Sequence, residues 1–159
     1  MKKQFLAILA LSTLVACVST DNSLLVGTSA DYAPYEYHLV VDGKDTIVGF
    51  DIDIAKFIAA ELDKELVIQD IAFDGLLQAL NAEKVEMVIA GMAPTEERSK
   101  VVDFSDIYYI GSQSILIRAE DAEAYTTLET LEGSKLGAQR GSLQEVLVKE
   151  EYSDSELVA

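Results

Sequence analysis

The sequence predicts an α/β fold with a largely parallel sheet. Short apolar stretches typical of strands alternate with stretches whose apolar residues recur at helical spacing, and this alternation indicates βαβ units. The chain has 159 residues and is 50% hydrophobic, a composition that favours a folded domain over disorder. This length is enough for a domain with a hydrophobic core.

The first part of the chain contains most of this pattern. Residues 24–26 begin a buried strand, and Asp42-Gly43 between two β-prone stretches predicts a hairpin. A helix is predicted from Asp51, with one buried face. The apolar residues of that predicted face are Ile54, Phe57, Ile58 and Leu62. The other predicted elements are a strand at 66–71, a short helix at 73–80, a buried strand at 86–90 and a helix from Thr95 to about Val101.

The rest of the chain continues the pattern more sparsely. We predict a strand at 114–117, a helical turn at 128–131, a strand at 135–138, and a helix capped by Ser142 that ends near Glu151. The predicted organisation is a first lobe at 24–112, a crossover at 113–130 and the start of a second lobe at 131–159. One strand, one helix and the beginning of another strand cannot enclose a core. The second lobe is therefore expected to be incomplete, as in a truncated chain.

The N-terminus predicts export. Lys2 and Lys3 precede an apolar stretch that is too short to span a bilayer, which fits a signal peptide at 1–16. Small residues lead directly to Cys17, as in the lipobox of bacterial lipoproteins, so we expect a lipid anchor at Cys17 followed by a tether at 17–23. An ordinary signal peptide with an incidental cysteine is the alternative. Cys17 is the only cysteine, so an intrachain disulfide is excluded.

The charge balance argues against nucleic acid as a partner. The formal charge is −16, and removal of Lys2 and Lys3 with the signal peptide would make it −18. Binding to a phosphate backbone requires clustered Lys and Arg. The net charge does not identify a ligand, because one local site can have the opposite sign.

The sharpest candidate site is the segment from Ala90 to Arg98. It runs from the end of a buried strand into a predicted helix, and ligands of open α/β sheets bind at the carboxyl ends of strands. The small residues Ala90, Gly91 and Ala93 allow close approach to the backbone. The predicted helix start favours an anion, and Arg98 can pair with a carboxylate through two parallel hydrogen bonds. The alternative is an ordinary helix start whose arginine is solvated or paired with a nearby acid.

A second anion-binding element and three aromatic residues accompany this segment. Gln139-Arg140-Gly141-Ser142 again leads from a strand into a helix N-terminus, although a Gly-Ser cap is common by itself. Tyr32 and Phe73 follow strands, where they could contact a ligand's side chain. Tyr35 and Tyr37 are more simply explained by local packing.

Other reactive side chains have structural interpretations. Asp51 and Asp53 resemble a catalytic pair but are expected to cap a helix, and His38 has no acid or metal-ligand cluster near it in the sequence. Met87 and Met92 are expected in the core. No zinc site, Ser-His or Cys-His nucleophile, Walker loop or Gly-x-Gly-x-x-Gly motif is evident, so we predict no metal and no cofactor.

The ordered set of motifs resembles solute-binding protein family 3, the polar-amino-acid-binding proteins of bacterial ABC importers. Each stretch is weak alone, but their order along the chain is specific. The matching stretches are Gly27-Thr28, Tyr32-Ala33-Pro34-Tyr35-Glu36, Gly49 to Ala55, Phe73-Asp74-Gly75-Leu76, Gly91 to Arg98, Val102-Asp103-Phe104-Ser105, Tyr108-Tyr109 and Gln139-Arg140-Gly141-Ser142.

The resemblance implies a type II periplasmic-binding-protein fold whose two lobes close on one amino acid. Arg98 would hold the ligand's α-carboxylate with backbone N–H groups near Ala93 and Ser142, and Tyr32 and Phe73 would stack on the side chain. Ser29 stands where binders of cationic amino acids often have an acid, which argues against a purely basic ligand. Ala90 and Ala93 replace the serines of many relatives, with Gly91 between them, so hydroxyl partners for the ligand's ammonium are lost.

The resemblance also implies partners and limits. The expected partners are an amino acid and a membrane permease, with the protein monomeric and held at the outer face of the membrane. The family's acid for the α-ammonium lies beyond position 159, so we expect this chain to bind amino acids poorly. A sensory or adhesive ectodomain of the same fold is an alternative, which a fused signalling domain would favour. A dehydratase-like enzyme is another, but no general acid or base stands out among the motif residues.

Overall fold

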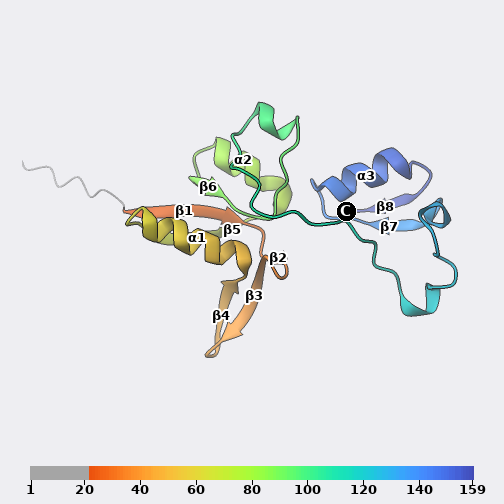
Figure 1. The fold of residues 1–159 in the computed structure, drawn as a ribbon, viewed down its shortest axis with the longest axis horizontal. Helices are drawn as coiled ribbons and strands as arrows, with labels where there is room; N and C mark the ends of the chain where they lie inside the picture. The colour runs from red at the N-terminus through yellow and green to blue at the C-terminus, as the bar shows by residue number, and fades with distance from the viewer. Residues whose placement is uncertain (1–21) are drawn as a thin grey trace, which may run out of the picture.

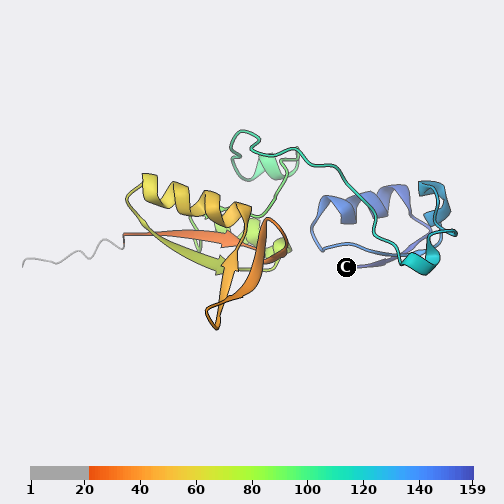
Figure 2. The ribbon, with the colours of Figure 1, turned by 60° about the horizontal axis from the view of Figure 1, so that its bottom comes forward.

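The computed structural model describes residues 22–159, and the predicted signal peptide, Cys17 and most of the tether lie outside the described residues. The secondary-structure elements gather in two groups joined by a long crossover, as Figures 1 and 2 show. The first group holds α1, α2 and six strands, and the second holds α3 and two strands. None of the helices in this described part is long and apolar enough to cross a membrane.

A three-stranded parallel sheet forms the centre of the first group. Its strand order is β5-β1-β6, which confirms the predicted parallel sheet. β1 pairs with β5 over its whole length, and with β6 through Val26 and Gly27 only. The strands are β1 (Ser23–Thr28), β5 (Glu65–Asp70) and β6 (Met87–Val88).

Helices cover both faces of this sheet. On one face, α1 (Phe50–Glu61) packs its Ala55 and Ala59 against Leu24 and Val26 of β1. On the other face lies α2 (Leu76–Asn81), which follows a 3-10 turn at Phe73–Gly75. A Cβ on Gly27 would lie 3.2 Å from the Leu76 side chain, so glycine lets α2 approach β1 closely.

The buried face of α1 differs from the predicted one. Phe57 and Leu62 are 66% and 55% exposed, while Ile54 and Ile58 are only partly buried. The residues that α1 buries are Asp51, Ile52, Ala55 and Ala59. The prediction was therefore partly right, because Ile54 and Ile58 pack against the core. Phe57 and Leu62 face outward, and the most buried positions are instead Ile52 and the small alanines, which let the helix lie close to the sheet.

The predicted hairpin is confirmed as part of an antiparallel sheet with strand order β2-β3-β4. The turn residues Asp42 and Gly43 both have positive φ, 50° and 76°. Two left-handed residues make the tight turn that matches the twist of two-residue hairpins. The strands are β2 (Asp31–Tyr32), β3 (Glu36–Val41) and β4 (Lys44–Val48).

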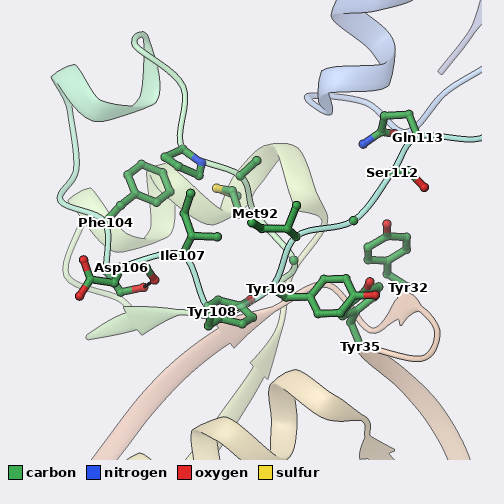
Figure 3. Close-up of a pocket in the computed structure, with 16 residues that line it drawn as sticks. Tyr32, Tyr35, Met92, Phe104, Asp106, Ile107, Tyr108, Tyr109, Ser112 and Gln113 are labelled. Atoms are coloured by element: carbon green, nitrogen blue, oxygen red, sulfur yellow. Dashed lines mark hydrogen bonds between the residues drawn. The ribbon is translucent and has the colours of Figure 1, made fainter.

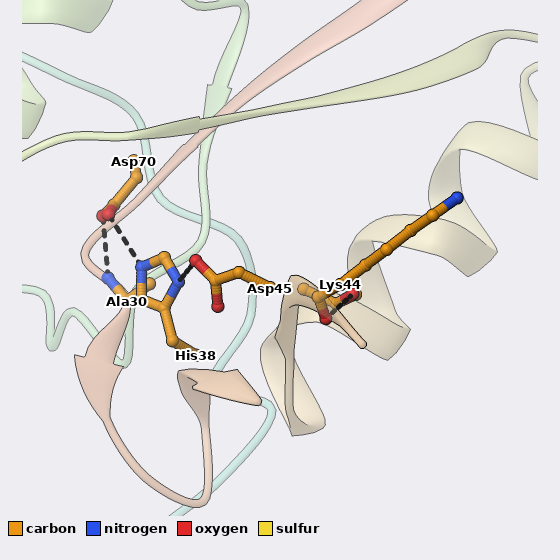
Figure 4. Close-up of polar contacts among 6 residues, drawn as sticks. Ala30, His38, Lys44, Asp45 and Asp70 are labelled. Atoms are coloured by element: carbon orange, nitrogen blue, oxygen red, sulfur yellow. Dashed lines mark hydrogen bonds and ion pairs between the residues drawn. The ribbon is translucent and has the colours of Figure 1, made fainter. Parts of the chain in front are cut away.

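His38 connects this hairpin to the central sheet. Its Nδ1 lies 2.9 Å from an Asp45 oxygen on β4, and its Nε2 lies 3.1 Å from an Asp70 oxygen at the end of β5 (Figure 4). Asp70 also accepts a hydrogen bond from the Ala30 N–H. The prediction that no acid cluster surrounds His38 was wrong, because the hairpin pairing brings Asp45 beside it and the end of β5 brings Asp70 from 32 positions away. Hydrogen bonds to Asp70 and then Asp45 raise the pKa of His38.

The second group is small. β7 (Lys135–Gly137) and β8 (Glu156–Val158) pair in parallel, and α3 (Leu143–Glu151) contacts β8. A 3-10 turn at Leu128–Leu131 confirms the predicted helical turn. Ser142 caps α3 as predicted, because its hydroxyl accepts a hydrogen bond from the Glu145 N–H.

Two predicted elements do not form. The predicted helix at 95–101 is reduced to a 3-10 turn, Arg98–Lys100. The predicted strand at 114–117 has no strand assignment among the described residues, and Leu116 is 98% exposed. A strand is stabilised by neighbouring backbone groups, and no described strand pairs with this segment.

Candidate ligand-binding cleft

A cavity of about 370 Å³ lies between the two groups, at the carboxyl ends of β1 and β6. Open α/β sheets place ligands at this edge. Both groups and the crossover contribute to the wall. The lining residues are Asp31, Tyr32, Glu36, Phe73, Ala90, Gly91, Ala93, Arg98, Gln113, Gly137, Ala138, Gln139, Ser142, Leu143 and Gln144.

Arg98 lies in the wall of this cavity and touches both groups. Its Nη1 donates to the Ala93 carbonyl at 2.7 Å, and its Nη2 donates to the Gly141 carbonyl at 2.9 Å. The Thr95 hydroxyl accepts the Arg98 backbone N–H at 3.1 Å and so holds the turn that carries the side chain. The guanidinium is thus fixed at the entrance between the two groups.

The charge of Arg98 is not neutralised by an acid. None of the ion pairs formed within residues 22–159 involves it. The guanidinium is partly buried, and this burial lowers the pKa of Arg98. Its Cζ lies 5.5 Å from the centroid of the Phe73 ring, a cation–π contact. A partly buried cation held by neutral oxygens and an aromatic face is suited to receive a carboxylate.

Asp51 fixes the loop that carries the small residues. Its Oδ2 accepts the Gly91 N–H at 2.7 Å and the Tyr108 hydroxyl at 2.9 Å. The predicted capping role was wrong for Asp51, because Gly49 is the N-cap of α1 and no side chain caps it. Asp53 is exposed and pairs with Lys56 instead.

Aromatic rings border the Gly91 loop. Gly91 has φ +55°, and a Cβ there would lie 3.1 Å from the Tyr32 ring. Tyr32 stacks on Tyr35 at 5.0 Å between ring centroids, and Tyr35 meets Tyr109 edge-on at 5.5 Å. A hydrogen bond with Tyr109 is the main reason why the pKa of Tyr35 rises to about 12. Tyr35 therefore packs locally, as predicted.

These rings also line a second cavity of about 310 Å³, on the other side of Tyr32. Figure 3 shows Tyr32 and Tyr35 facing the crossover segment, with Tyr108 and Tyr109 between them and Ile107. Met92 lines this second cavity, whereas Met87 packs against the core as predicted.

Glu36 is a cavity residue that the sequence analysis did not single out. It lies at the start of β3, lines the cleft and is 0% exposed. Neither of its carboxyl oxygens has a hydrogen-bond partner among the described residues. Burial, followed by the charge of Asp51, raises the pKa of Glu36 to about 9. The sequence did contain a signal for Glu36 as a site residue, because this acid lies between Tyr35 and Tyr37, four positions after Tyr32.

The second group closes the cleft through hydrogen bonds. Gln139 Nε2 donates to Asp31 at 3.1 Å, and Gln144 Nε2 donates to the Gln113 side chain at 2.6 Å. At the start of α3, the Gly141 N–H donates to the Glu145 carboxylate at 2.6 Å. The chain's own acid therefore occupies part of the predicted second anion-binding element.

The structure brings most of the predicted site residues together. Ser29 is the exception, because it does not line the cavity. Its side chain is buried, and its hydroxyl donates a hydrogen bond to Asp31 at 3.3 Å. The predicted residues in the cavity wall are Tyr32, Phe73, Ala90, Gly91, Ala93, Arg98 and Ser142.

Residues 24–155 match the family described as "Bacterial extracellular solute-binding proteins, family 3". The chain belongs to this family. Family 3 membership agrees with the predicted type II periplasmic-binding-protein fold, of which the chain contains one larger and one smaller lobe.

Relatives of this family 3 chain include named arginine-binding proteins. The arginine-binding extracellular protein ArtP of Bacillus subtilis is 40% identical, over 94% of this chain and 60% of the relative. ABC transporter arginine-binding protein 1 of Escherichia coli is 32% identical, over 100% of this chain and 63% of the relative.

A solved structure agrees with this assignment. The amino acid ABC transporter substrate-binding protein AbpA of Streptococcus pneumoniae, bound to L-arginine, matches with a TM-score of 0.83 and 42% identity. The match covers 86% of this chain and 58% of that one. The chain spans about 60% of the length of the curated relatives it matches.

Proposed function

We propose that this family 3 chain captures a cationic amino acid outside the cytoplasm and delivers it to an ABC importer permease. The observation that carries the proposal is Arg98, a partly buried cation with no acidic partner among residues 22–159, at the entrance of a cavity between two lobes. The proposed ligand's α-carboxylate takes this arginine as its counter-ion.

Backbone groups and aromatic rings support the rest of the ligand. Ala93 and Ser142 line the cavity with Arg98. Near Ser142, the Gly141 and Ser142 N–H groups already donate to Glu145 and to the Gln139 carbonyl, so backbone help for the carboxylate is proposed on the Ala93 side only. Tyr32 and Phe73, which border the same cavity, provide apolar faces for the ligand's side chain.

We infer a basic ligand, although Ser29 was expected to argue against a purely basic one. Ser29 lies outside the cavity, so its lack of charge does not bear on the ligand. Glu36 supplies a carboxyl group in the cavity wall. The names of the arginine-binding relatives support the same ligand class.

Calorimetric titration tests the carboxylate role. The purified protein is titrated with L-arginine and with agmatine, which has the same guanidinium but no carboxylate. Although the expected absence of an acid for the α-ammonium weakens both ligands, agmatine should bind at least about 100-fold more weakly than L-arginine, because a buried charge pair without its partner loses about 3–5 kcal/mol.

A matched pair of variants completes the test. Arg98→Ala should lose about as much affinity as removal of the ligand's carboxylate, whereas Arg118→Ala should bind normally. Arg118 is an exposed arginine whose partner is Asp121. Retained affinity in Arg98→Ala, or equal binding of agmatine and L-arginine, would refute the carboxylate role.

Membrane anchoring through Cys17 is tested in cells. Cys17→Ser should release the protein from the membrane fraction or leave it as unprocessed precursor. Lipid labelling that persists in Cys17→Ser would exclude Cys17 as the acceptor.

A further inference from the structure

Two buried carboxyl groups near the cleft have too few hydrogen-bond donors, and the charge of one acts on the other. Glu36 comes from β3 and Asp51 from α1, and both are 0% exposed. Both Glu36 oxygens and Asp51 Oδ1 lack hydrogen-bond partners among the described residues. Buried acceptors without donors are costly, and two adjacent buried carboxylates repel each other. One added proton relieves both costs, because a protonated carboxyl can donate to its neighbour.

The surroundings determine which carboxyl keeps the proton. Asp51 Oδ2 already accepts two hydrogen bonds, from the Gly91 N–H and from the Tyr108 hydroxyl. Glu36 accepts from no described donor, and its burial and the nearby Asp51 charge raise its pKa to about 9. Of the two carboxyl groups, Glu36 is therefore the one with no donor on either oxygen, and an added proton would satisfy it.

The other groups near Glu36 reinforce this arrangement. Asp31 of β2 adds a second negative charge that disfavours ionised Glu36. Tyr108, which precedes the crossover, donates to Asp51, and burial and then the Asp51 charge raise its pKa, so it stays a neutral donor. Arg98 is the only cation among the residues that line the cavity, and it donates to the Ala93 and Gly141 carbonyls.

We propose that the Glu36–Asp51 pair holds one proton in the unliganded cleft and releases it when a cationic amino acid binds. The inference rests on the proposed function for its ligand. On binding, the Glu36 O–H bond breaks, the proton passes to water, and the ligand's cationic side chain becomes the partner of the Glu36 carboxylate. One positive charge replaces another, so the net charge of the cleft is unchanged.

This exchange makes affinity depend on pH in one direction. Binding of the cation requires loss of a proton, so affinity rises with pH until free Glu36 is itself ionised. One proton released corresponds to about a tenfold gain in affinity per pH unit below that point. L-citrulline, a neutral analogue of arginine, leaves the proton on Glu36 and should show no such slope.

Calorimetry near neutral pH, in two buffers of different ionisation enthalpy, counts the protons released. We expect about one proton per L-arginine and about none per L-citrulline. Glu36→Gln, whose amide resembles the protonated acid, should fold normally and show neither release nor slope. The control Asp53→Asn changes an exposed acid on the same helix as Asp51 and should release the proton like the parent.

The outcomes separate this inference from the proposed function. If L-arginine binds without proton release, the shared proton is refuted and the proposed function stands. If no amino acid binds, the proposed function fails, and carboxyl ¹³C NMR of Glu36 in the unliganded protein decides the proton separately. A Glu36 signal protonated near neutral pH supports the shared proton, and an ionised one overturns it.

Discussion

Asp51 is predicted to be the most costly acidic residue to remove from the first lobe. Asp51→Ala takes away both hydrogen bonds of Oδ2, at 2.7 Å to the Gly91 N–H and 2.9 Å to the Tyr108 hydroxyl. The first bond fixes the cleft loop, and the second fixes the segment around Tyr108 that leads into the crossover. The substitution therefore separates α1 from both.

The structure sets the size of the effect. A hydrogen bond to a charged acceptor contributes about 1.5–3 kcal/mol, so the two bonds together contribute roughly 3–6 kcal/mol. Two effects reduce this sum. Tyr108 is 46% exposed, so its hydroxyl can bond to water after the substitution. Removal of a buried carboxylate also relieves the cost of its own desolvation. We expect a net loss of about 2–4 kcal/mol from a stability that is typically about 5–15 kcal/mol.

Urea unfolding monitored by tyrosine fluorescence measures this loss, since the chain has seven tyrosines and no tryptophan. Asp53→Ala is the matched control, because Asp53 lies two positions along the same helix and forms only an exposed pair with Lys56. Its expected loss is within about 0.5 kcal/mol. Equal losses for the two variants would show that Asp51 does not hold the loop and the crossover.

Three further predictions concern the cleft and the hairpin. Phe73→Leu removes the ring below Arg98 and should weaken L-arginine binding about 2- to 5-fold in calorimetry, and unchanged affinity would show that the cation–π contact adds nothing. Gly91→Ala should lower the free energy of unfolding in urea more than Gly43→Ala does. Both glycines have positive φ, but only at Gly91 would the added Cβ lie 3.1 Å from the Tyr32 ring. Equal losses, each about 1–2 kcal/mol, would contradict the effect of this contact. The pKa of His38 is raised in the fold, so protonated His38 stabilises the protein relative to the His38→Gln variant. This added stability should be present below the ordinary pKa of 6.5 and lost as pH rises through the raised pKa. A difference in urea midpoints between the two proteins that is independent of pH would refute this.

Local sequence patterns were sufficient to predict those features whose conformation depends on neighbouring residues. The hairpin turn followed from Asp42-Gly43, and the cap of α3 followed from Ser142, because each depends on a few adjacent backbone groups. The predicted cavity residues also depend mostly on local features, since Gly91 and Arg98 lie near the end of a strand of the parallel sheet.

Long-range contacts account for what the sequence did not reveal. His38 gains its acids from Asp45 and from Asp70, which is 32 positions away. Asp51, at the start of α1, accepts a hydrogen bond from Gly91, which is 40 positions away, and so connects α1 to the loop after β6. Which side of α1 is buried depends on how closely its alanines approach the sheet, and the spacing of apolar residues in the sequence does not reveal this.

The Gly141 carbonyl already accepts a hydrogen bond from Arg98 and therefore competes with a ligand for this guanidinium. An incoming molecule must offer this guanidinium something better than a neutral oxygen. An amide such as argininamide would exchange one neutral acceptor for another and gain little, whereas a carboxylate adds full charge to the bond. For the proposed amino-acid ligand, the contact that bridges the two lobes would thus select for a free carboxylate over the same side chain with its carboxyl group blocked.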